Sequence, residues 1–164
     1  MLSRRSGFTL IEILVTVTII AVLSGIVLVA TSGVRLKARD AKRKTELAQF
    51  GRLIAMSCYL PDAGAGDYDL AEMLTEFVAK NSRYAALISR TPQDPKTGSD
   101  DESGYRYVVS ADGKKCAFYA NLENKDEPLT NPRLTAPMPG GGTGTFRATT
   151  DGPNGSPIYF QVSN

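Results

Sequence analysis

One acidic residue stands alone in a long apolar segment near the N-terminus. Glu12 is the only charged residue between Phe8 and Val34, where Leu, Ile and Val predominate. A single carboxylate in hydrocarbon costs about 2.5–3.5 kcal/mol, so a residue of this kind implies a function and a partner. Because no Lys or Arg lies within the segment, we expect the partner to come from another chain, or from a new amino group made by cutting this one.

Residue types that carry catalysis are scarce in the rest of the chain. The chain has no His and only two Cys, which excludes His-based triads and zinc sites. Several loop acids have the chemistry of calcium ligands, but no EF-hand spacing is present and solvated acids are the simpler interpretation. These acids are Asp94, Asp100, Asp101, Asp126 and Asp151. We therefore expect no catalytic residue, no metal site and no cofactor.

The apolar segment from Phe8 to Val34 predicts a membrane-spanning helix. It follows a short leader that contains Arg4 and Arg5. As a helix it is roughly 40 Å long, which exceeds a hydrocarbon core of about 30 Å. A secretory signal core has only about 7–15 apolar residues, so an export signal is the poorer interpretation. Its Ser and Thr hydroxyls can bond to the preceding turn of the helix.

The segment Gly7–Glu12, with the sequence GFTLIE between a basic leader and an apolar run, resembles the processing site of type IV prepilins and of the related pseudopilins of type II secretion. In that family a membrane-embedded prepilin peptidase cuts between the residues that match Gly7 and Phe8, and it methylates the new N-terminus at the position of Phe8. The resemblance covers about the first 30 residues. A looser similarity to pseudopilin heads follows at Asp94–Pro95 and at Tyr105–Tyr107.

The resemblance implies a structural subunit of a type IV pilus or a pilus-like filament. Cleavage leaves a cationic amine on Phe8, and Glu12 lies just over one helical turn further along, on nearly the same face. An arriving subunit would place its amine against Glu12 of a neighbour, which sets register more than it adds stability. The implied partners are prepilin peptidase, further copies of the chain and related pilins, the pilus assembly platform with its motor ATPase, and the lipid bilayer.

Other interpretations remain open at this point. Glu12 can instead be a carboxylate that snorkels to the interface of an ordinary anchor. The whole protein can be a type II secretion pseudopilin, or a membrane-anchored adhesin or DNA-binding head that never polymerises. A basic run with little aromatic interleaving is weak evidence for DNA.

Two patterns disagree about orientation in the membrane. Two bases precede the apolar segment and six follow it, and the positive-inside tendency would therefore put the C-terminal side in the cytoplasm. The resemblance implies the reverse, with the leader in the cytoplasm, the head outside the inner membrane, and a surface pilus after assembly; we expect this orientation. We expect the six bases to form a solvated collar near anionic headgroups. They are Arg35, Lys37, Arg39, Lys42, Arg43 and Lys44.

Four regions follow from these patterns: a leader (1–7), the membrane half of a long helix (8–34), its amphipathic half (35–60) and a globular head (61–164). An apolar stripe predicts that the long helix continues to about Tyr59 and packs on the head. The stripe consists of Leu36, Leu47, Phe50, Ile54 and Cys58. The expected fold is α+β and pilin-like, with a small antiparallel sheet laid across the helix.

Within the head, Asp69 and Glu72 indicate the start of a second helix. Its core-facing stripe is Leu70, Met73, Leu74, Phe77 and Val78. A further short turn is expected at 84–88 and a loop at 91–104.

Strand patterns fill the rest of the head. Residues 105–109 and 116–120 predict a hairpin that turns at Asp112-Gly113. A long loop rich in Pro and Gly follows, and residues 146–149 and 158–162 predict two closing strands.

The two cysteines, Cys58 and Cys116, lie near the end of the long helix and in the hairpin. A disulfide between them would tie the helix to the sheet if the head is exported, and two buried free thiols are the alternative.

Overall fold

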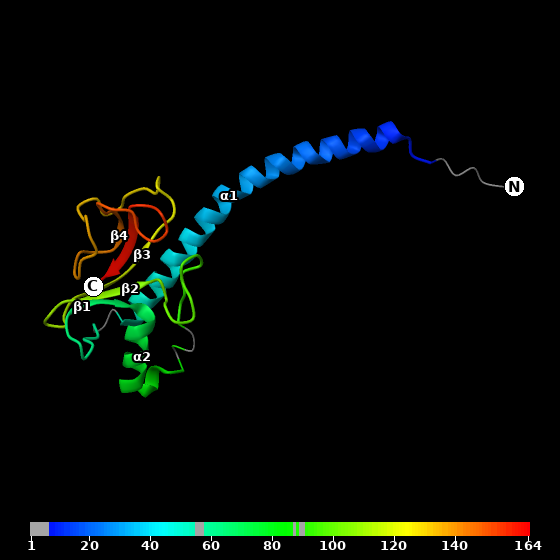
Figure 1. The fold of residues 1–164 in the computed structure, drawn as a ribbon. Coiled ribbons are helices and arrows are strands. Elements are labelled where there is room, and N and C mark those ends of the chain that lie inside the picture. The colour runs from blue at the N-terminus through cyan, green and yellow to red at the C-terminus, as the bar shows by residue number, and fades with distance from the viewer. Residues whose placement is uncertain (1–6, 55–57, 87, 89–90) are drawn as a thin grey trace. The chain divides into compact units, whose positions relative to one another are not determined.

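The computed structural model describes residues 7–54, 58–86, 88 and 91–164. The chain divides into two compact units, Met1–Leu36 and Lys37–Asn164. Helix α1 (Leu10–Ile54) begins in the first unit and ends in the second (Figure 1). Residues 1–6 of the expected leader lie outside the described part.

Helix α1 ends earlier than its apolar stripe predicts. Its last residue is Ile54, and Cys58–Leu60 are not helical, so the expected end near Tyr59 was wrong. Tyr59 uses its backbone groups differently: its N–H donates to Tyr107 Oη, and its carbonyl accepts from the same hydroxyl. These bonds replace the ones that a further helical turn would make.

A five-stranded antiparallel sheet forms the centre of the second unit. Its strands are β1 (Gly66–Asp69), β2 (Arg106–Val109), β3 (Cys116–Asn121), β4 (Gly144–Arg147) and β5 (Ile158–Ser163). Their order in the sheet is β1-β2-β3-β5-β4. The expected hairpin is β2 and β3, and Gly113 takes a positive φ in its turn. The α+β pilin-like fold is confirmed.

Two strands differ from the expectation. The last pair is antiparallel as predicted, but β4 begins at Gly144, two residues before the predicted strand. Strand β1 was not predicted, because Gly-Asp-Tyr-Asp is short and polar. An edge strand needs only one paired side, and a sequence of this kind can form it.

Helix α2 (Leu70–Lys80) follows β1 directly and starts where the capping pattern places it. Asp69 Oδ1 accepts a hydrogen bond from the N–H of Ala71 at 2.8 Å. Leu70, Met73 and Leu74 are buried, as the stripe predicts. A 3₁₀ turn at Ser82–Tyr84 follows, two residues before the expected turn.

One hydrophobic core joins the C-terminal part of α1, helix α2 and one face of the sheet. Leu47 of α1 is fully buried among Tyr105, Tyr107 and Phe118. Phe50 packs against the edge of this cluster, which supports the predicted stripe. The side chain of Ile54 is not among those that the structure describes.

The Gly-rich segment before β4 is held in place by hydrogen bonds. Gly140 N–H donates to Ser163 Oγ at 2.8 Å, and the Gln161 side chain donates to the carbonyl of Gly142 at 2.7 Å. The segment therefore lies against β5.

Candidate functional site

The start of α1 is capped by reciprocal hydrogen bonds between Thr9 and Glu12. Glu12 Oε2 accepts from the Thr9 N–H at 2.9 Å and from its hydroxyl at 2.8 Å. Thr9 Oγ1 in turn accepts from the Glu12 N–H at 3.3 Å. This is a capping box, in which residues three apart satisfy each other's free N–H groups. The Thr-x-x-Glu spacing was visible in the sequence, but its capping role was missed.

The capping box leaves part of the Glu12 carboxylate unused. Both hydrogen bonds that this carboxylate accepts from described residues end on Oε2, and Oε1 accepts none from them. Phe8, at the expected cleavage point, is 84% exposed. Glu12 therefore has a free acceptor on the same stretch of chain as the expected new amine.

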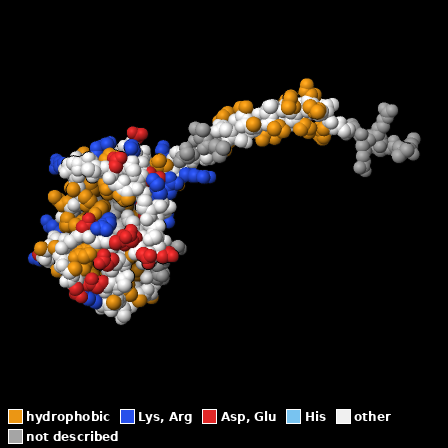
Figure 2. All heavy atoms as spheres, in the orientation of Figure 1, with side chains coloured by type: hydrophobic (Ala, Val, Ile, Leu, Met, Phe, Trp, Pro, Cys, Tyr) orange, Lys and Arg blue, Asp and Glu red, His pale blue; other side chains and the backbone are white. Residues whose placement is uncertain are grey.

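An uninterrupted apolar surface follows this acid along α1. Among the described residues, one 18-residue stretch, Leu10–Val27, is long and apolar enough to cross a membrane, and none of it is buried. Figure 2 shows hydrophobic side chains along this segment. The hydroxyls of Thr16 and Thr18 donate to carbonyls three residues earlier, as expected. Every large side chain of the stretch is thus available to lipid or to other helices.

The basic residues that follow form a solvated collar only in part, and the expectation was wrong for Arg43 above all. Arg43 is fully buried in the second unit. Its guanidinium donates two bonds to the Asp94 carboxylate, at 2.7 and 2.8 Å, and one each to Asp40 and Glu123, both at 2.7 Å. We call Arg43 and these three acids the Arg43 cluster. A buried guanidinium with this many carboxylates is compensated rather than left as an isolated charge.

Neighbouring bases extend the Arg43 cluster toward the surface. Arg39 makes a bidentate pair with Glu123, at 2.7 and 2.6 Å. Lys44 pairs with Glu127. Arg35 and Lys37 are exposed, and neither forms an ion pair with a described residue. The bases of the sequence therefore divide into a set that binds the head and a set that faces solvent.

Asp94 also differs from its expected role as a solvated loop acid. It is 3% exposed, and it accepts from Arg43, from the Asn154 side chain and from the N–H groups of Lys96 and Thr97. Burial alone would raise the pKa of Asp94, but these hydrogen bonds lower it to about 2. No group of acidic residues in the described part of the chain has the arrangement of a metal site.

The pKa values of Glu123 and Arg43 shift in the directions that ion pairing requires. The hydrogen bond from Arg39, against the opposing effect of burial and with help from Arg43, lowers the pKa of Glu123 to about 2. Burial would lower the pKa of Arg43, but the bonds to Asp94 and Glu123 outweigh burial and raise it. Arg43, Asp94 and Glu123 are therefore charged at neutral pH.

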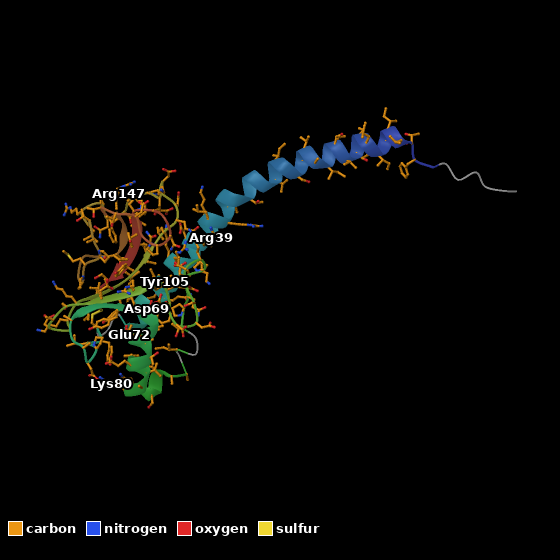
Figure 3. All side chains as sticks on the ribbon, in the orientation of Figure 1. Arg39, Asp69, Glu72, Lys80, Tyr105 and Arg147 are labelled. Atoms are coloured by element: carbon orange, nitrogen blue, oxygen red, sulfur yellow. A yellow bond between two sulfur atoms is a disulfide. The ribbon has the colours of Figure 1, made fainter. Side chains whose placement is uncertain are left out.

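The two tyrosines of the Tyr-x-Tyr pattern contact the helix and the segment after it. Tyr105, which is labelled in Figure 3, donates from Oη to Glu46 of α1 at 2.6 Å. Tyr107 Oη donates to the Tyr59 carbonyl at 2.6 Å. Burial raises the pKa of Tyr107 to about 12, so its hydroxyl keeps its proton.

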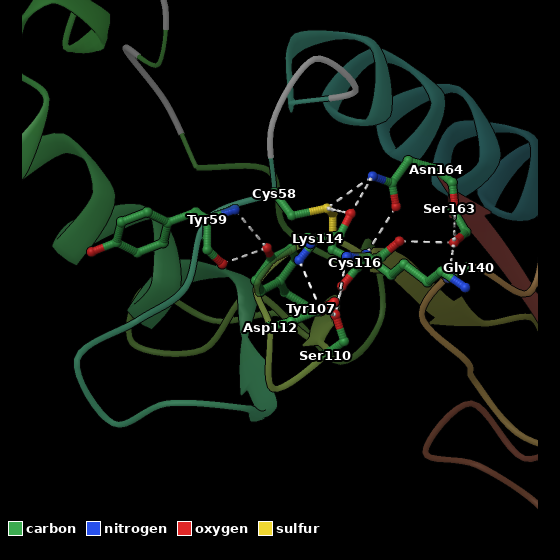
Figure 4. Close-up of a disulfide and its surroundings, with 11 residues drawn as sticks. Cys58, Tyr59, Tyr107, Ser110, Asp112, Lys114, Cys116, Gly140, Ser163 and Asn164 are labelled. Atoms are coloured by element: carbon green, nitrogen blue, oxygen red, sulfur yellow. Dashed lines mark hydrogen bonds between the residues drawn. A yellow bond between two sulfur atoms is a disulfide. The ribbon is translucent and has the colours of Figure 1, made fainter.

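A disulfide joins Cys58 to Cys116 (Figure 4). It links the segment after α1 to the first residue of β3, across 58 residues of sequence. The C-terminal residue Asn164 lies beside it and donates from its side chain to Cys58 Sγ and to the Lys114 carbonyl. In the chain-entropy model a loop of this length is worth about 4 kcal/mol. The predicted bridge is confirmed.

Comparison with known proteins bears on the N-terminal segment. The family model described as the prokaryotic N-terminal methylation motif matches residues 2–28, which contain Gly7, Phe8 and Glu12. No curated protein and no solved structure matches the chain. Proteins with this motif are structural subunits rather than a family of enzymes. The chain thus carries the leader signature of type IV pilins and pseudopilins, and this signature supports a pilin-like precursor.

Proposed function

We propose that the chain is a structural subunit that polymerises into a type IV pilus or a pilus-like filament through the exposed apolar part of α1. The observation that carries this proposal is the 18-residue apolar stretch with a single acid near its start, within the matched motif. A passive anchor has no need of an acid in lipid, which costs about 2.5–3.5 kcal/mol. A filament uses that acid to receive the amine of the next subunit.

In this proposal prepilin peptidase cuts between Gly7 and Phe8 and methylates Phe8. The assembly platform and its motor ATPase then move the subunit out of the bilayer. The Phe8 amine of the arriving subunit pairs with the free oxygen of Glu12 on a neighbour. In a low dielectric the pair attracts strongly, while desolvation offsets much of this attraction, so the pair mainly sets the register between helices.

We also propose that the leader lies in the cytoplasm and the head outside the inner membrane. The Cys58–Cys116 disulfide supports this orientation, since disulfides persist in oxidising compartments and are rare in the cytoplasm. A reporter that is active only outside the cytoplasm, fused after Asn164, should be active. Activity of a reporter that works only in the cytoplasm, fused at the same place, would show that the orientation is the reverse of the proposed one.

The assembly role of Glu12 is tested by replacing it with Ala. We expect E12A to lose its leader normally but to form no filaments, because the arriving amine has no acceptor. The measurement is electron microscopy of sheared fibres, with the leader followed by mass.

The capping box supplies the matched control. Thr9→Val removes the hydroxyl of the box, with a cost of about 1 kcal/mol to the helix, and leaves the acid in place. T9V should still form filaments. If T9V and E12A fail alike, capping explains the loss, and normal filaments from E12A would refute the assembly role altogether.

A type II secretion pseudopilin is the second candidate. The packing of Tyr105 and Tyr107 against α1 and Tyr59 favours it, since the Tyr-x-Tyr region resembles pseudopilin heads. Deletion of the gene distinguishes the two candidates. Loss of a pilus subunit abolishes surface fibres, whereas loss of a pseudopilin abolishes protein secretion and leaves surface fibres in place.

A further inference from the structure

A cavity of about 420 Å³ lies on the head, next to the face of the sheet that points away from the core. Tyr107 and Phe118 pack in the core with Leu47. Because neighbouring strand residues point to opposite faces, Arg106 and its register partner Tyr119 face the other way and line the cavity. The volume lies in the range of about 300–1,000 Å³ that is usual for small-molecule sites.

Aromatic rings form one wall of this cavity. The ring centroids of Tyr119 and Tyr159 are 6.2 Å apart, and Phe146 stacks on Tyr159 at 5.7 Å. Tyr119 and Phe146 are buried, while Tyr159 is partly exposed. The neighbouring rings hold Tyr159 in place, so it presents a fixed aromatic surface to a ligand.

A half-exposed ion pair supplies polar groups beside this wall. Arg106 Nε donates to Asp67 Oδ1 at 3.2 Å, and Tyr119 Oη donates to Asp67 Oδ2. The two side chains of the pair are 41% and 45% exposed. A guanidinium has five N–H donors, and Arg106 uses two of its groups, Nε and Nη2, in hydrogen bonds to Asp67. Donors and acceptors of the pair therefore remain open to a ligand.

Most charges that line the cavity are already compensated. Asp67 is paired with Arg106, and the Asp69 carboxylate accepts from three backbone N–H groups. Glu102 is exposed and has no ion pair within the described residues. An anionic ligand would therefore meet an excess of carboxylates, whereas a neutral ligand with several hydroxyl groups can use the donors and the acceptors together.

We propose that this cavity binds a neutral sugar, one or two pyranose units of a glycan. The C–H face of the ring packs on Tyr159, and its hydroxyls accept from Arg106 and donate to Asp67 and Glu102. The proposal is independent of filament assembly, because all of the lining residues belong to the second unit. On a filament, the same site would be repeated on every subunit.

The test uses the full chain in phospholipid nanodiscs that contain no glycolipid and no sugar-based detergent. The probes are the methyl glycosides of glucose, mannose, galactose and N-acetylglucosamine, at millimolar concentration. Saturation-transfer NMR measures binding. We expect at least one glycoside to bind, and its affinity to fall about tenfold in E102Q, which loses a charge-assisted hydrogen bond, and also in R106Q.

Asp101→Asn is the matched control. Asp101 is the exposed neighbour of Glu102 and is not among the lining residues, so D101N should bind the glycoside as the unchanged chain does. Near-UV circular dichroism checks that each variant is folded. The proposal is overturned if no glycoside binds, if E102Q and R106Q both bind normally, or if N-acetyl-lysine methylamide binds more tightly than all four sugars.

Discussion

Arg43 joins three carboxylates that are far apart in the sequence. Asp40 lies on the same helix, whereas Asp94 and Glu123 are 51 and 80 residues away. The carboxylates come from α1, from the loop before β2 and from the segment after β3. The geometry of one guanidinium therefore sets how this part of α1 lies on the head.

Replacing Arg43 with Met should destabilise the head strongly. The variant leaves Asp40, Asp94 and Glu123 buried without their shared cation, and breaking a buried pair in this way costs about 3–5 kcal/mol. Urea denaturation followed by circular dichroism measures the change. The control is Arg133→Ala: this side chain is exposed and forms no hydrogen bond or ion pair within the described part of the chain, so the stability of R133A should stay within about 0.5 kcal/mol of the unchanged chain. Equal stability of the two variants would contradict the role of Arg43.

The Arg43 cluster also predicts how stability depends on pH. The pKa values of Asp94 and Glu123 fall from 3.8 and 4.5 to about 2 on folding. Groups with a lowered pKa stabilise the fold fully above their unfolded pKa, and this stabilisation is lost as pH falls toward the folded pKa. The free energy of unfolding should therefore be level from about pH 7 to 5.5 and should fall between about pH 5 and 2. Denaturation curves at each pH measure the free energy of unfolding. Its decrease at acidic pH should be smaller in the double variant D94N/E123Q.

The sequence suggested the importance of Glu12 and of the two cysteines, but not that of Arg43. A lone acid in an apolar run stands out because its surroundings are uniform. Arg43 lies in a run of bases, where solvation is the ordinary expectation, and its partners Asp94 and Glu123 lie far along the chain. Only the packing of the head onto α1 brings them together, and no local pattern contains that information.

At the level of elements, α1 approaches β5 closely at Gly51. A Cβ at this position would lie 2.3 Å from Val162 Cγ1. Glycine costs about 1 kcal/mol of helix propensity compared with alanine, and the close approach of the strand explains its presence in the helix. The small residue thus serves packing rather than helix formation.

Gly51→Ala should lower stability by about 1 kcal/mol, since overpacking costs about 1–3 kcal/mol and helix propensity returns about 1. In a Val162→Ala background the clash is gone, and the same change should instead raise stability by up to about 1 kcal/mol. Thermal unfolding of the four chains of this cycle measures the effect. If Gly51→Ala changes the stability in the same direction in both backgrounds, α1 and β5 are not this close.

Elements with strong periodicity were predicted well. The stripe from Leu70 to Val78 and the Asp112-Gly113 turn each carry a local pattern that specifies one structure, and α2 and the hairpin follow it. Strand β1 carries no such pattern, and the apolar stripe near the end of α1 predicted a longer helix than the structure has. Both depend on partners elsewhere: β1 pairs with β2, and the segment after α1 is held by Tyr107 and Cys116.

In the molecule as a whole, the two units carry different features. The apolar part of α1 carries the methylation motif and the single acid, while the head has its own core, its ion-pair cluster and its disulfide. A subunit that enters a filament through its helix must carry its head with it. The Arg43 cluster and the disulfide supply two attachments between the head and the chain of α1, one before the end of the helix and one after it.

The most direct test is mass spectrometry of the N-terminus of the chain recovered from sheared filaments. We predict a chain that begins at Phe8 with a methylated amine, and filaments that contain it. An intact leader, or a trimmed chain found only as monomers dispersed in the bilayer, would contradict the account.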